Sequence, residues 1–339
     1  MEYPLKKNFL KLEDYLSLAK SYKPIYITSR TKSSKDKLEF LLKRNKLIKL
    51  DGDYLIIVTD SNSKQFKLNS LTDFFSEECR IRCKIEGFKY SPLESFIKNN
   101  DKVMEEMNRV YEGKINDKNI NEFMEYKGSW VDAKMCSNYK LTYLLGIMDY
   151  FKPKRWLDLS AGWGDRLISA ILKDVEYYVG VDPNPCLQPC YKSIIETLVP
   201  EDKRKNYRVY EDKAESIDLD SKESGTFDFI FTSPPFFTFE IYSEAEGQSV
   251  TSYNTVDLWL NNFLFKSIDN SWDKLEKYGH YALYIEDKPQ YRYIDKLLQF
   301  MKEKPDCKFK GILYQAFYDK KYPKNHQYYL RNVYIWTKI

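Results

Sequence analysis

From about residue 130 to the end of the chain, two spacings of hydrophobic residues take turns along the sequence. Continuous apolar runs of strand length are separated by stretches in which apolar residues recur every three or four positions, as on one face of a helix. The strand-like runs are residues 155–160, 177–182, 206–212, 227–233 and 280–287, and helix-like stretches between them include 165–173 and 186–198. Strands that alternate with helices predict an α/β fold with a mostly parallel, doubly wound sheet.

Two further apolar runs, residues 309–317 and 331–339, end the sequence without a helical pattern between them. Strands joined by a short connection pair as an antiparallel hairpin, because a parallel pair needs a long crossover. The expected sheet therefore has seven strands, and the last two form a hairpin.

The first 98 residues have a different pattern and predict a small α+β accessory domain. Residues 34–48 have helical apolar spacing with a basic opposite face, and residues 49–60 predict a glycine-turned strand or hairpin. Residues 99–129 are polar and weakly periodic, which indicates a connecting helix and a linker. The predicted α/β domain then covers residues 130–339.

Positive charge is concentrated at the amino end. The whole chain has a net charge of +4, whereas residues 1–50 hold 13 Lys and Arg against 5 Asp and Glu. This local excess favours a polyanionic partner such as nucleic acid, and the chain's 29 tyrosines supply flat amphipathic rings that suit contact with bases. A solvated, lysine-rich surface would give the same composition, so the sequence leaves both interpretations open.

Neither a membrane span nor a secretion signal is expected. No run of about 18 apolar residues occurs, and the first residues lack the apolar core of a signal peptide. We expect an intracellular protein, cytoplasmic or located with its nucleic acid in a nucleoid or nucleus. Of the six cysteines, four form two C-x3-C pairs, Cys79/Cys83 and Cys186/Cys190, far from both histidines in the sequence. We therefore expect free thiols and no metal site.

The turn after the first strand of the α/β domain has the composition of a ligand-binding loop. In LDLSAGWGDRL, residues 157–167, small residues let the backbone turn tightly beside a ligand before a helix begins. The dinucleotide pattern G-x-G-x-x-G is not met, because Leu167 stands at its third glycine. The turn therefore favours a cofactor without pyrophosphate, with candidate binding residues Asp158, Ser160, Ala161, Gly162 and Gly164.

Acidic residues follow the next two strands. Asp182 ends the second strand, where a carboxylate can accept hydrogen bonds from two ribose hydroxyls. Asp212 and Glu215 follow the third strand, where an adenine ring would lie. Each acid alone would also fit a helix cap, but their order and spacing together predict a ligand with adenine and ribose and no phosphate. S-adenosylmethionine is such a ligand.

The fourth strand ends in Thr232-Ser233-Pro234-Pro235-Phe236, and two prolines stop a strand because neither donates an N–H. This stretch resembles the motif of the amino-methyltransferases, which is Asp, Asn or Ser, then Pro-Pro, then an aromatic residue. The resemblance covers roughly residues 130–339. It implies a Rossmann-like class I methyltransferase fold, S-adenosylmethionine as the cofactor, and catalytic roles for Ser233, Pro234, Pro235 and Phe236.

These residue types suit methylation of an exocyclic amine, a poor nucleophile because its lone pair is delocalised. The Ser233 hydroxyl and the Pro234 carbonyl can accept the two amine hydrogens in positions that the prolines hold before the reaction. Phe236 can stack on a base that has been flipped out of a helix. Serine at the first position resembles the N4-cytosine branch of the family, whereas phenylalanine at the fourth also occurs in adenine-N6 enzymes. We expect either base as the target, and DNA in preference to RNA.

About 30 polar and aromatic residues after the motif predict a substrate loop followed by a helix. Its candidate substrate contacts are Phe237, Glu240, Tyr242, Gln248, Ser249 and Tyr253. This part of the sequence also resembles predicted DNA methyltransferases of viruses and phages. Around the final hairpin, phosphates could be contacted by Lys321, Lys324, His326 and Arg331.

Three alternative functions stay open. An RNA N6-adenosine methyltransferase would use the same chemistry on another nucleic acid. A protein glutamine N5-methyltransferase is the second, although the release-factor enzymes of that kind carry Asn-Pro-Pro-Tyr and a helical amino-terminal domain. The third is a non-catalytic nucleic-acid-binding module that has kept the fold. Because no large recognition insert separates the glycine loop from the motif, a protein partner or a homodimer could supply specificity.

Overall fold

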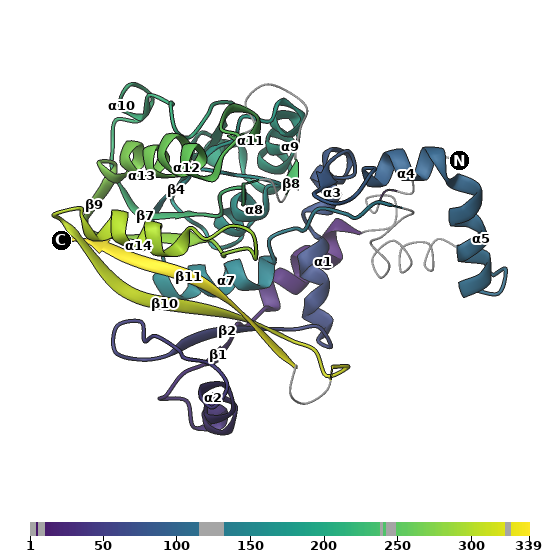
Figure 1. Ribbon diagram of the computed structural model, residues 1–339, viewed down its shortest axis with the longest axis horizontal. Helices are drawn as coiled ribbons and strands as arrows, with labels where there is room; N and C mark the ends of the chain where they lie inside the picture. Colours follow the sequence, from purple (N-terminus) through teal and green to yellow (C-terminus); the bar gives the residue numbers. More distant parts are fainter. Residues whose placement is uncertain (1–4, 6–10, 115–131, 238–239, 242–248, 323–326) are drawn as a thin grey trace.

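The computed structural model describes residues 5, 11–114, 132–237, 240–241, 249–322 and 327–339 (Figure 1). Its centre is a nine-stranded sheet with the strand order β1-β2-β10-β11-β9-β7-β4-β5-β6. The strands are β1 (Ile25–Ile27), β2 (Leu55–Asp60), β4 (Arg155–Asp158), β5 (Tyr177–Val181), β6 (Tyr207–Tyr210), β7 (Phe227–Thr232), β9 (Leu275–Tyr284), β10 (Cys307–Tyr318) and β11 (Tyr328–Lys338). A separate two-stranded sheet pairs β3 (Lys84–Ile85) with β8 (Glu240–Ile241).

Five neighbouring strands of the large sheet, β6, β5, β4, β7 and β9, run parallel to one another. The connecting helices cover both faces of the sheet. On one face, α8 (Asp165–Leu172) and α9 (Gln188–Leu198) pack into a core cluster with α7 (Leu141–Phe151). On the other, α13 (Phe265–Trp272) and α14 (Ile294–Lys302) pack into a second cluster. The predicted doubly wound α/β fold is therefore confirmed.

The carboxyl-terminal hairpin is also confirmed. β10 and β11 pair antiparallel from Cys307 opposite Lys338 to Tyr318 opposite Tyr328. β11 pairs antiparallel with β9 as well, so the last strand of the chain is inserted between β9 and β10. A parallel doubly wound sheet with its last strand inserted in this way is the Rossmann-like class I methyltransferase fold.

Two strands from the amino-terminal part of the chain extend this sheet beyond the seven that were expected. β2 pairs parallel with β10, from Leu55 opposite Leu313 to Asp60 opposite Tyr318, and β1 pairs antiparallel with β2. Between them lies α2 (Lys35–Leu42), which is shorter than the predicted helix at 34–48. The described part of residues 1–98 therefore shares its main sheet with residues 130–339, while the domain boundaries at 98 and 130 stay a prediction.

The remaining helices surround the sheet and its amino-terminal extension; α3 packs against α9 and η4, and α4 and α5 extend away from the sheet (Figure 1). They are α1 (Leu12–Ser21), α3 (Asp73–Arg80), α4 (Pro92–Lys98), α5 (Asn100–Val110), α10 (Leu219–Lys222), α11 (Ser249–Ser252) and α12 (Val256–Trp259). Short 3-10 segments are η2 (Lys32–Ser34), η3 (Lys64–Ser70), η4 (Pro185–Leu187) and η5 (Glu201–Asn206), and η6 (Leu260–Leu264) is π-helical.

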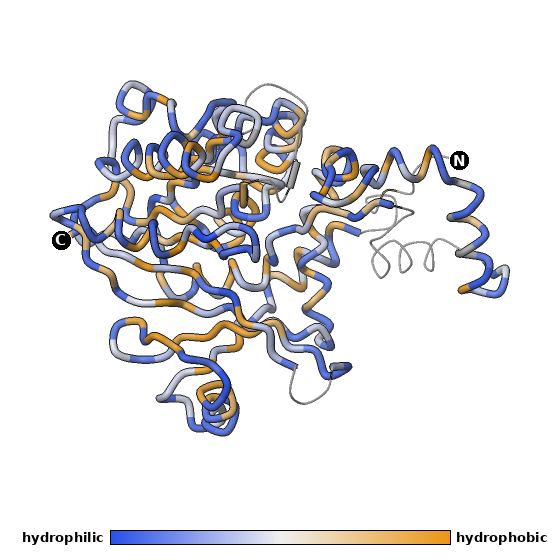
Figure 2. The backbone as a smooth tube through the Cα atoms, viewed as in Figure 1, coloured by the Kyte–Doolittle hydropathy of each residue, from blue (hydrophilic) through white to orange (hydrophobic). Residues whose placement is uncertain are grey.

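The alternation of side chains along the strands divides the core in two. In β7, Phe229 and Phe231 belong to the cluster beneath α7, α8 and α9, whereas Ile230 belongs to the cluster on the opposite face. The central strands are accordingly hydrophobic on both faces, as Figure 2 shows along the middle of the molecule. Across the described ranges, no helix combines the length and apolar character needed to cross a membrane.

Candidate active site

A cavity of about 430 Å³ lies at the carboxyl ends of β4, β5, β7 and β9. Open α/β sheets bind ligands in the crevice at this edge, where the loops that follow the strands lead into the next helices. The glycine loop after β4, the turn after β5, the Ser-Pro-Pro-Phe motif after β7 and residues after β9 all contribute to its wall. Four stretches that are distant in the sequence thus meet at one site.

Within the glycine loop, the predicted cofactor residues have two different positions. Ser160, Ala161 and Gly162 line the cavity. Asp158 does not line it: the carboxylate is fully buried and accepts hydrogen bonds from Arg166 Nε at 2.7 Å and from the Tyr178 hydroxyl at 2.8 Å. Asp158 therefore belongs to the buried hydrogen-bond network beneath the glycine loop and not to the cavity wall.

Gly164 also has a structural explanation. It precedes α8 with φ +97°, and a Cβ there would lie 2.6 Å from Ile194 Cδ1 of α9. Glycine at this position lets α8 and α9 approach each other, and the residue is not part of the cavity wall.

Asp182 is the acid that the sequence placed at the end of the second strand, and it does line the cavity. Its carboxylate accepts hydrogen bonds from the backbone N–H of Gly162 at 2.8 Å and of Asn184 at 3.0 Å. Burial raises the pKa of Asp182 to about 6, against the lowering effect of these two N–H groups. A buried carboxylate thus links the loops after β4 and β5 at the cavity wall.

After β6, the structure separates the two candidate acids. Glu215 lines the cavity and accepts a hydrogen bond from the Tyr253 hydroxyl at 3.2 Å. Burial raises the pKa of the Glu215 carboxyl. Asp212 lies outside the wall, where its Oδ1 accepts from the N–H of Lys213. Tyr253 contributes to the site through Glu215 rather than as a wall residue.

All four motif residues, Ser233, Pro234, Pro235 and Phe236, line the cavity. Ser233 is half-buried, and its hydroxyl forms no hydrogen bond with the part of the chain that the structure describes. The Phe236 ring lies 5.5 Å from the Tyr284 ring, and Lys288 Nζ lies 4.9 Å from its centroid.

The segment that follows the motif only partly matches the predicted substrate contacts. Phe237 has a positive φ of +52° and points into the core, where its ring lies 5.0 Å from that of Tyr291. It is 4% exposed and does not line the cavity. Ser249 does line it and accepts a hydrogen bond from Trp259 Nε1.

For three further candidate substrate contacts, the structure describes no side chain. Glu240 is described only as a backbone position in β8, opposite Ile85. Tyr242 and Gln248 lie outside the described residues, as do Lys324 and His326 of the final hairpin.

Several wall residues were not among those chosen from the sequence. They come from the segment before α7, from the loops after β5 and β6, and from β9, β11 and the connection after β9. The main ones are Asn138, Tyr139, Asn184, Lys213, Tyr284, Glu286, Lys288 and Tyr329. The pair of acids in YIED, at the end of a predicted strand, was the one local signal for Glu286.

Amino-terminal residues support the glycine loop from the side opposite the sheet. The Thr72 hydroxyl, at the start of α3, donates to Asp165 in the first turn of α8. Asp165 lines the cavity and is 2% exposed, and burial raises its pKa to about 7. Asp73 pairs with the buried Arg80 and accepts from Asn138 Nδ2 at 2.9 Å. The amino-terminal helices are therefore part of the site's frame.

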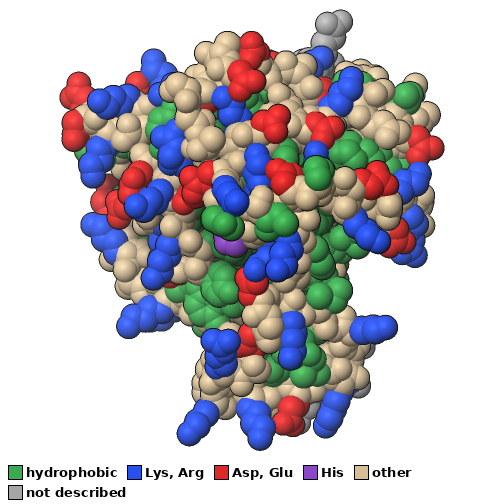
Figure 3. Space-filling model, turned by 90° about the vertical axis from the view of Figure 1, so that its left-hand side faces the viewer, with side chains coloured by type: hydrophobic (Ala, Val, Ile, Leu, Met, Phe, Trp, Pro, Cys, Tyr) green, Lys and Arg blue, Asp and Glu red, His purple; other side chains and the backbone are tan. Residues whose placement is uncertain are grey.

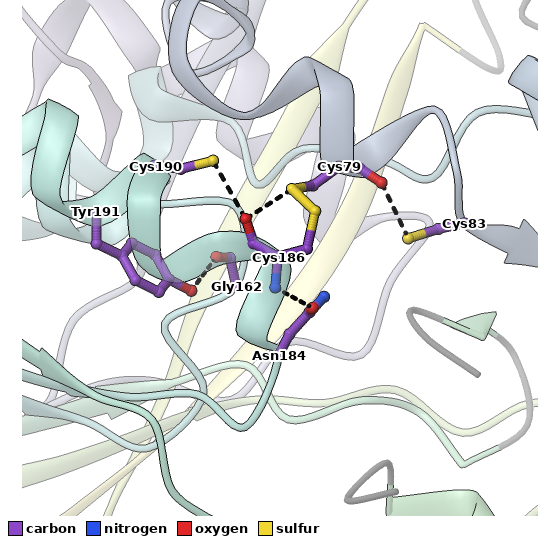
Figure 4. Close-up of a disulfide and its surroundings, with 7 residues drawn as sticks. All are labelled: Cys79, Cys83, Gly162, Asn184, Cys186, Cys190 and Tyr191. Atoms are coloured by element: carbon purple, nitrogen blue, oxygen red, sulfur yellow. Dashed lines mark hydrogen bonds between the residues drawn. A yellow bond between two sulfur atoms is a disulfide. The ribbon is translucent and has the colours of Figure 1, made fainter. Parts of the chain in front are cut away.

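A disulfide connects helix α3 of the amino-terminal part to the loop after β5 (Figure 4). Cys79 of α3 is bonded to Cys186 of η4, which follows Asp182 directly in the loop after β5. This disulfide brings the two C-x3-C pairs together. Within each pair, the second cysteine donates from Sγ to the carbonyl of the first, Cys190 to Cys186 and Cys83 to Cys79. The expectation of free thiols was wrong for Cys79 and Cys186. It failed because their pairing depends on tertiary contact between segments 107 residues apart.

The glycine-loop side of the cavity fits a nucleoside better than a dinucleotide. Arg166, the cation nearest the loop, is held by Asp158 at 2.7 Å and is not available to neutralise a pyrophosphate. The first turn of α8, where dinucleotide-binding folds receive pyrophosphate, instead presents the buried carboxyl of Asp165. A ligand with ribose hydroxyls for Asp182 and no phosphate suits these groups, and S-adenosylmethionine fits them.

The strand order is that of the Rossmann-like class I methyltransferase fold, and residues 233–236 form part of the wall of the cavity at the carboxyl ends of its strands. No protein-family model and no curated protein matches the chain.

Similar solved structures include the N-methyltransferase NodS from Bradyrhizobium japonicum WM9 in complex with S-adenosyl-L-homocysteine. It is 11% identical, the match covers 58% of this chain and 85% of that chain, and the TM-score is 0.38. Another is precorrin-6y C5,15-methyltransferase from Geobacter metallireducens GS-15, with 15% identity, 59% and 86% coverage and a TM-score of 0.37. Likenesses at this level assign no residue and no substrate to this chain.

Proposed function

We propose that this protein transfers the methyl group of S-adenosylmethionine to an exocyclic amine of a nucleic-acid base, N4 of cytosine or N6 of adenine, with DNA preferred over RNA. The observation that carries the proposal is that Ser233 of the motif and Asp182 of the nucleoside side line one cavity. A methyl donor bound through Asp182 and an amine held by Ser233 would then share the same space.

In this proposal, the residues of the motif have separate roles in binding and orienting the amine. The Ser233 hydroxyl, which is not engaged by the described residues, and the Pro234 carbonyl accept the two amine hydrogens and favour a pyramidal nitrogen. Both prolines fix the direction of that carbonyl, so little reorganisation accompanies the reaction. No strong base is needed at the amine, because the proton leaves after the methyl group has been transferred.

Phe236 provides a flat surface for the base. Its ring lines the cavity and is held at one side by Tyr284. A base enters a cavity at a sheet edge only after it leaves its own stack, and an aromatic ring restores part of the lost stacking energy.

The cofactor residues hold the other half of the cavity. Asp182 accepts the ribose hydroxyls, Ser160, Ala161 and Gly162 give the backbone close approach, and Glu215 lies at the adenine end. When bound, S-adenosylmethionine supplies an electrophilic methyl group on a sulfonium.

The α2 basic cluster supports a nucleic-acid partner. It consists of the exposed residues Lys32, Lys35, Lys37, Lys43, Arg44, Lys46 and Lys49. Figure 3 shows Lys and Arg side chains around the lobe that carries α2. Three strands separate β2 from β7, which is roughly 19 Å at the usual spacing between strands. The cluster precedes β2 and lies at the amino ends of β2 and β10, the sheet edge opposite the cavity, so its proposed role is to hold nucleic acid at a distance from the reacting base. A protein partner or a homodimer remains part of the proposal as a source of sequence specificity.

The test is transfer of a labelled methyl group from S-adenosylmethionine to DNA, RNA and protein, followed by mass spectrometry of the nucleosides. N4-methylcytosine or N6-methyladenine from DNA is the expected product. Ser233→Ala should abolish most of the label, and Ser216→Ala, which changes an exposed serine outside the cavity, should not.

Other outcomes would replace the proposal. Label found in RNA alone would give the RNA enzyme, and label on a protein glutamine would give the amide methyltransferase. A protein that binds nucleic acid but not S-adenosylhomocysteine would be a non-catalytic module.

A further inference from the structure

The cavity wall opposite the glycine loop is built by the end of β9, the connection after it and the start of β11. It presents Tyr284, Glu286, Lys288, Tyr329 and Arg331, and all five line the same cavity as Ser233. β9 and β11 are neighbours in the sheet, with Tyr284 opposite Val333. Tyr284, Tyr329 and Arg331 of this wall belong to paired strands, whereas Glu286 and Lys288 lie in the connection after β9.

Arg331 is the most notable cation of this wall. Its guanidinium carbon lies 5.9 Å from the Tyr284 ring centroid and 5.5 Å from that of Tyr329. Within the described ranges, no carboxylate oxygen lies within 4.0 Å of its nitrogens, although Glu286 belongs to the same wall. A half-buried guanidinium that lines a cavity and lies near two rings is suited to an anion.

Lys288 brings a second positive charge to the same wall. Its ammonium lies 4.9 Å from the centroid of Phe236, the ring on which the base is proposed to stack. The backbone at this position is held by reciprocal hydrogen bonds between Lys288 and Tyr291, each 3.0 Å long. The cation thus lies over the Phe236 ring, beside the space in which a base would stack.

Glu286 sets the charge of the wall. With two cations and one carboxylate, the wall has a net charge of about +1 when all three are ionised. Four residues of the final hairpin were predicted as phosphate contacts, and one of them, Arg331, lines the cavity. Lys321 does not line it, and Lys324 and His326 lie outside the described residues.

We propose that Arg331 and Lys288 form an anion subsite that holds a phosphodiester group of the nucleic-acid strand next to the methylated base. The inference rests on the proposed function and makes it more specific: the enzyme selects a base within a polynucleotide over the same base as a free nucleoside. Arg331 binds the phosphate oxygens through two parallel N–H groups, and Lys288 adds a point charge from the Phe236 side.

The experiment compares methyl transfer to a short oligonucleotide with transfer to the matching free nucleoside, which has no phosphodiester. In Arg331→Gln and Lys288→Gln, the KM for the oligonucleotide should rise about tenfold to a hundredfold, as expected for one lost charge-assisted hydrogen bond. The rise in KM should be much smaller for the nucleoside than for the oligonucleotide, and Lys320→Gln, which lies outside the cavity, should change neither KM. Arg331→Lys should restore part of the affinity because it keeps the charge.

Salt dependence gives a second measurement. Each lost phosphate contact should reduce the slope of log affinity against log salt by about 0.7 for a single strand or about 0.9 for a duplex. The matched control is Lys320→Gln, which removes an exposed charge from the same hairpin outside the cavity. An Arg331→Gln variant whose oligonucleotide KM and salt slope match those of Lys320→Gln would overturn the proposal.

A failure of the proposed function is distinguishable from a failure of the subsite. If the wild-type protein methylates no nucleic acid, the proposed function is wrong, and equilibrium binding of the fluorescein-labelled oligonucleotide then decides on the subsite. Binding that is weakened in Arg331→Gln but not in Lys320→Gln supports it. Absence of binding, or equal binding by both variants, rejects it.

Discussion

Asp182 gives the sharpest test of the cofactor side, because its carboxylate has two protein donors and still faces the cavity. Replacement by Asn keeps the shape but removes one acceptor oxygen. One of the two N–H groups, that of Gly162 or that of Asn184, is then left without its partner, and the ribose loses a charged acceptor. A hydrogen bond to a charged group contributes about 1.5–3 kcal/mol. The Kd for S-adenosylhomocysteine should therefore rise about tenfold to more than a hundredfold in Asp182→Asn.

The pH dependence of binding follows from the same carboxylate. Burial raises its pKa to about 6, and only the ionised form accepts both ribose hydroxyls. Since apparent affinity is scaled by the ionised fraction, cofactor affinity should be about tenfold weaker at pH 5 than at pH 7. The fold without ligand has the opposite dependence: a raised carboxyl pKa means that the folded state binds more protons, so this group's contribution to stability falls as pH rises from about 4 to 6.

Isothermal titration calorimetry with S-adenosylhomocysteine between about pH 5 and pH 8 measures the effect of the substitution and the pH dependence of binding, and denaturant titration over the same range measures the stability. Asp212→Asn is the matched control, because Asp212 lies outside the cavity wall. The reasoning would be refuted by an Asp182→Asn protein that binds as tightly as Asp212→Asn, or by a wild-type affinity that is flat across this range.

Four other changes test separate parts of the structure. Ser233→Ala should leave cofactor affinity unchanged and raise the barrier to methyl transfer by about 2.7–4 kcal/mol, measured as single-turnover rates; an unchanged rate would remove Ser233 from the chemistry. Gly164→Ala should lower the free energy of unfolding by about 1–3 kcal/mol, because its φ is +97° and the new Cβ would clash with Ile194; denaturant titration checks this, and equal stability would contradict the contact. Cys79→Ser should lower the free energy of unfolding by about 2–4 kcal/mol under non-reducing conditions, and adding reductant should lower it no further. Cys307→Ser, which removes a free thiol, is the control. A Cys79→Ser protein that reductant still destabilises would argue against this disulfide. Reversing the charges of the α2 basic cluster to Glu should weaken oligonucleotide binding and flatten its salt dependence while leaving the Kd for S-adenosylhomocysteine unchanged; fluorescence anisotropy in which binding is preserved would show that the cluster is a solvated surface.

Local patterns were sufficient for most of the fold. Each strand of the parallel core and the final hairpin was found within a few residues of its observed position, because period and turn chemistry are properties of neighbouring residues. The helix at 34–48 was predicted too long: α2 ends at Leu42, and Ile48 instead donates its backbone N–H to the hydroxyl of Tyr314 in β10. The edge pairing of β2 with β10 could not be read from the sequence, because it depends on two strands about 250 residues apart.

The candidate site shows the same division. Asp182 and Ser233 were found because strand order in a doubly wound sheet brings successive carboxyl ends together. Asp158 was predicted to bind the cofactor, whereas in the structure it forms an ion pair with Arg166, eight residues later. Arg166 is not part of the glycine-rich pattern, so the pattern did not indicate this ion pair. Arg331 is one of four similar cations in the sequence, and only the register of β11 against β9 distinguishes it.

The parallel pairing of β2 with β10 also has a consequence for how the chain is made. Ribosomes deliver about 250 residues between the end of β2 and the start of β10, which takes roughly 12 to 50 s at ordinary rates of synthesis. Throughout that interval, the apolar residues Leu55 to Val58, which are buried in the finished protein, have no neighbour on their inner side. The nascent chain therefore presents the unpaired edge of β2 to chaperones and to other nascent chains until β10 has been made, although β1 and α7, two other native neighbours of β2, are made earlier.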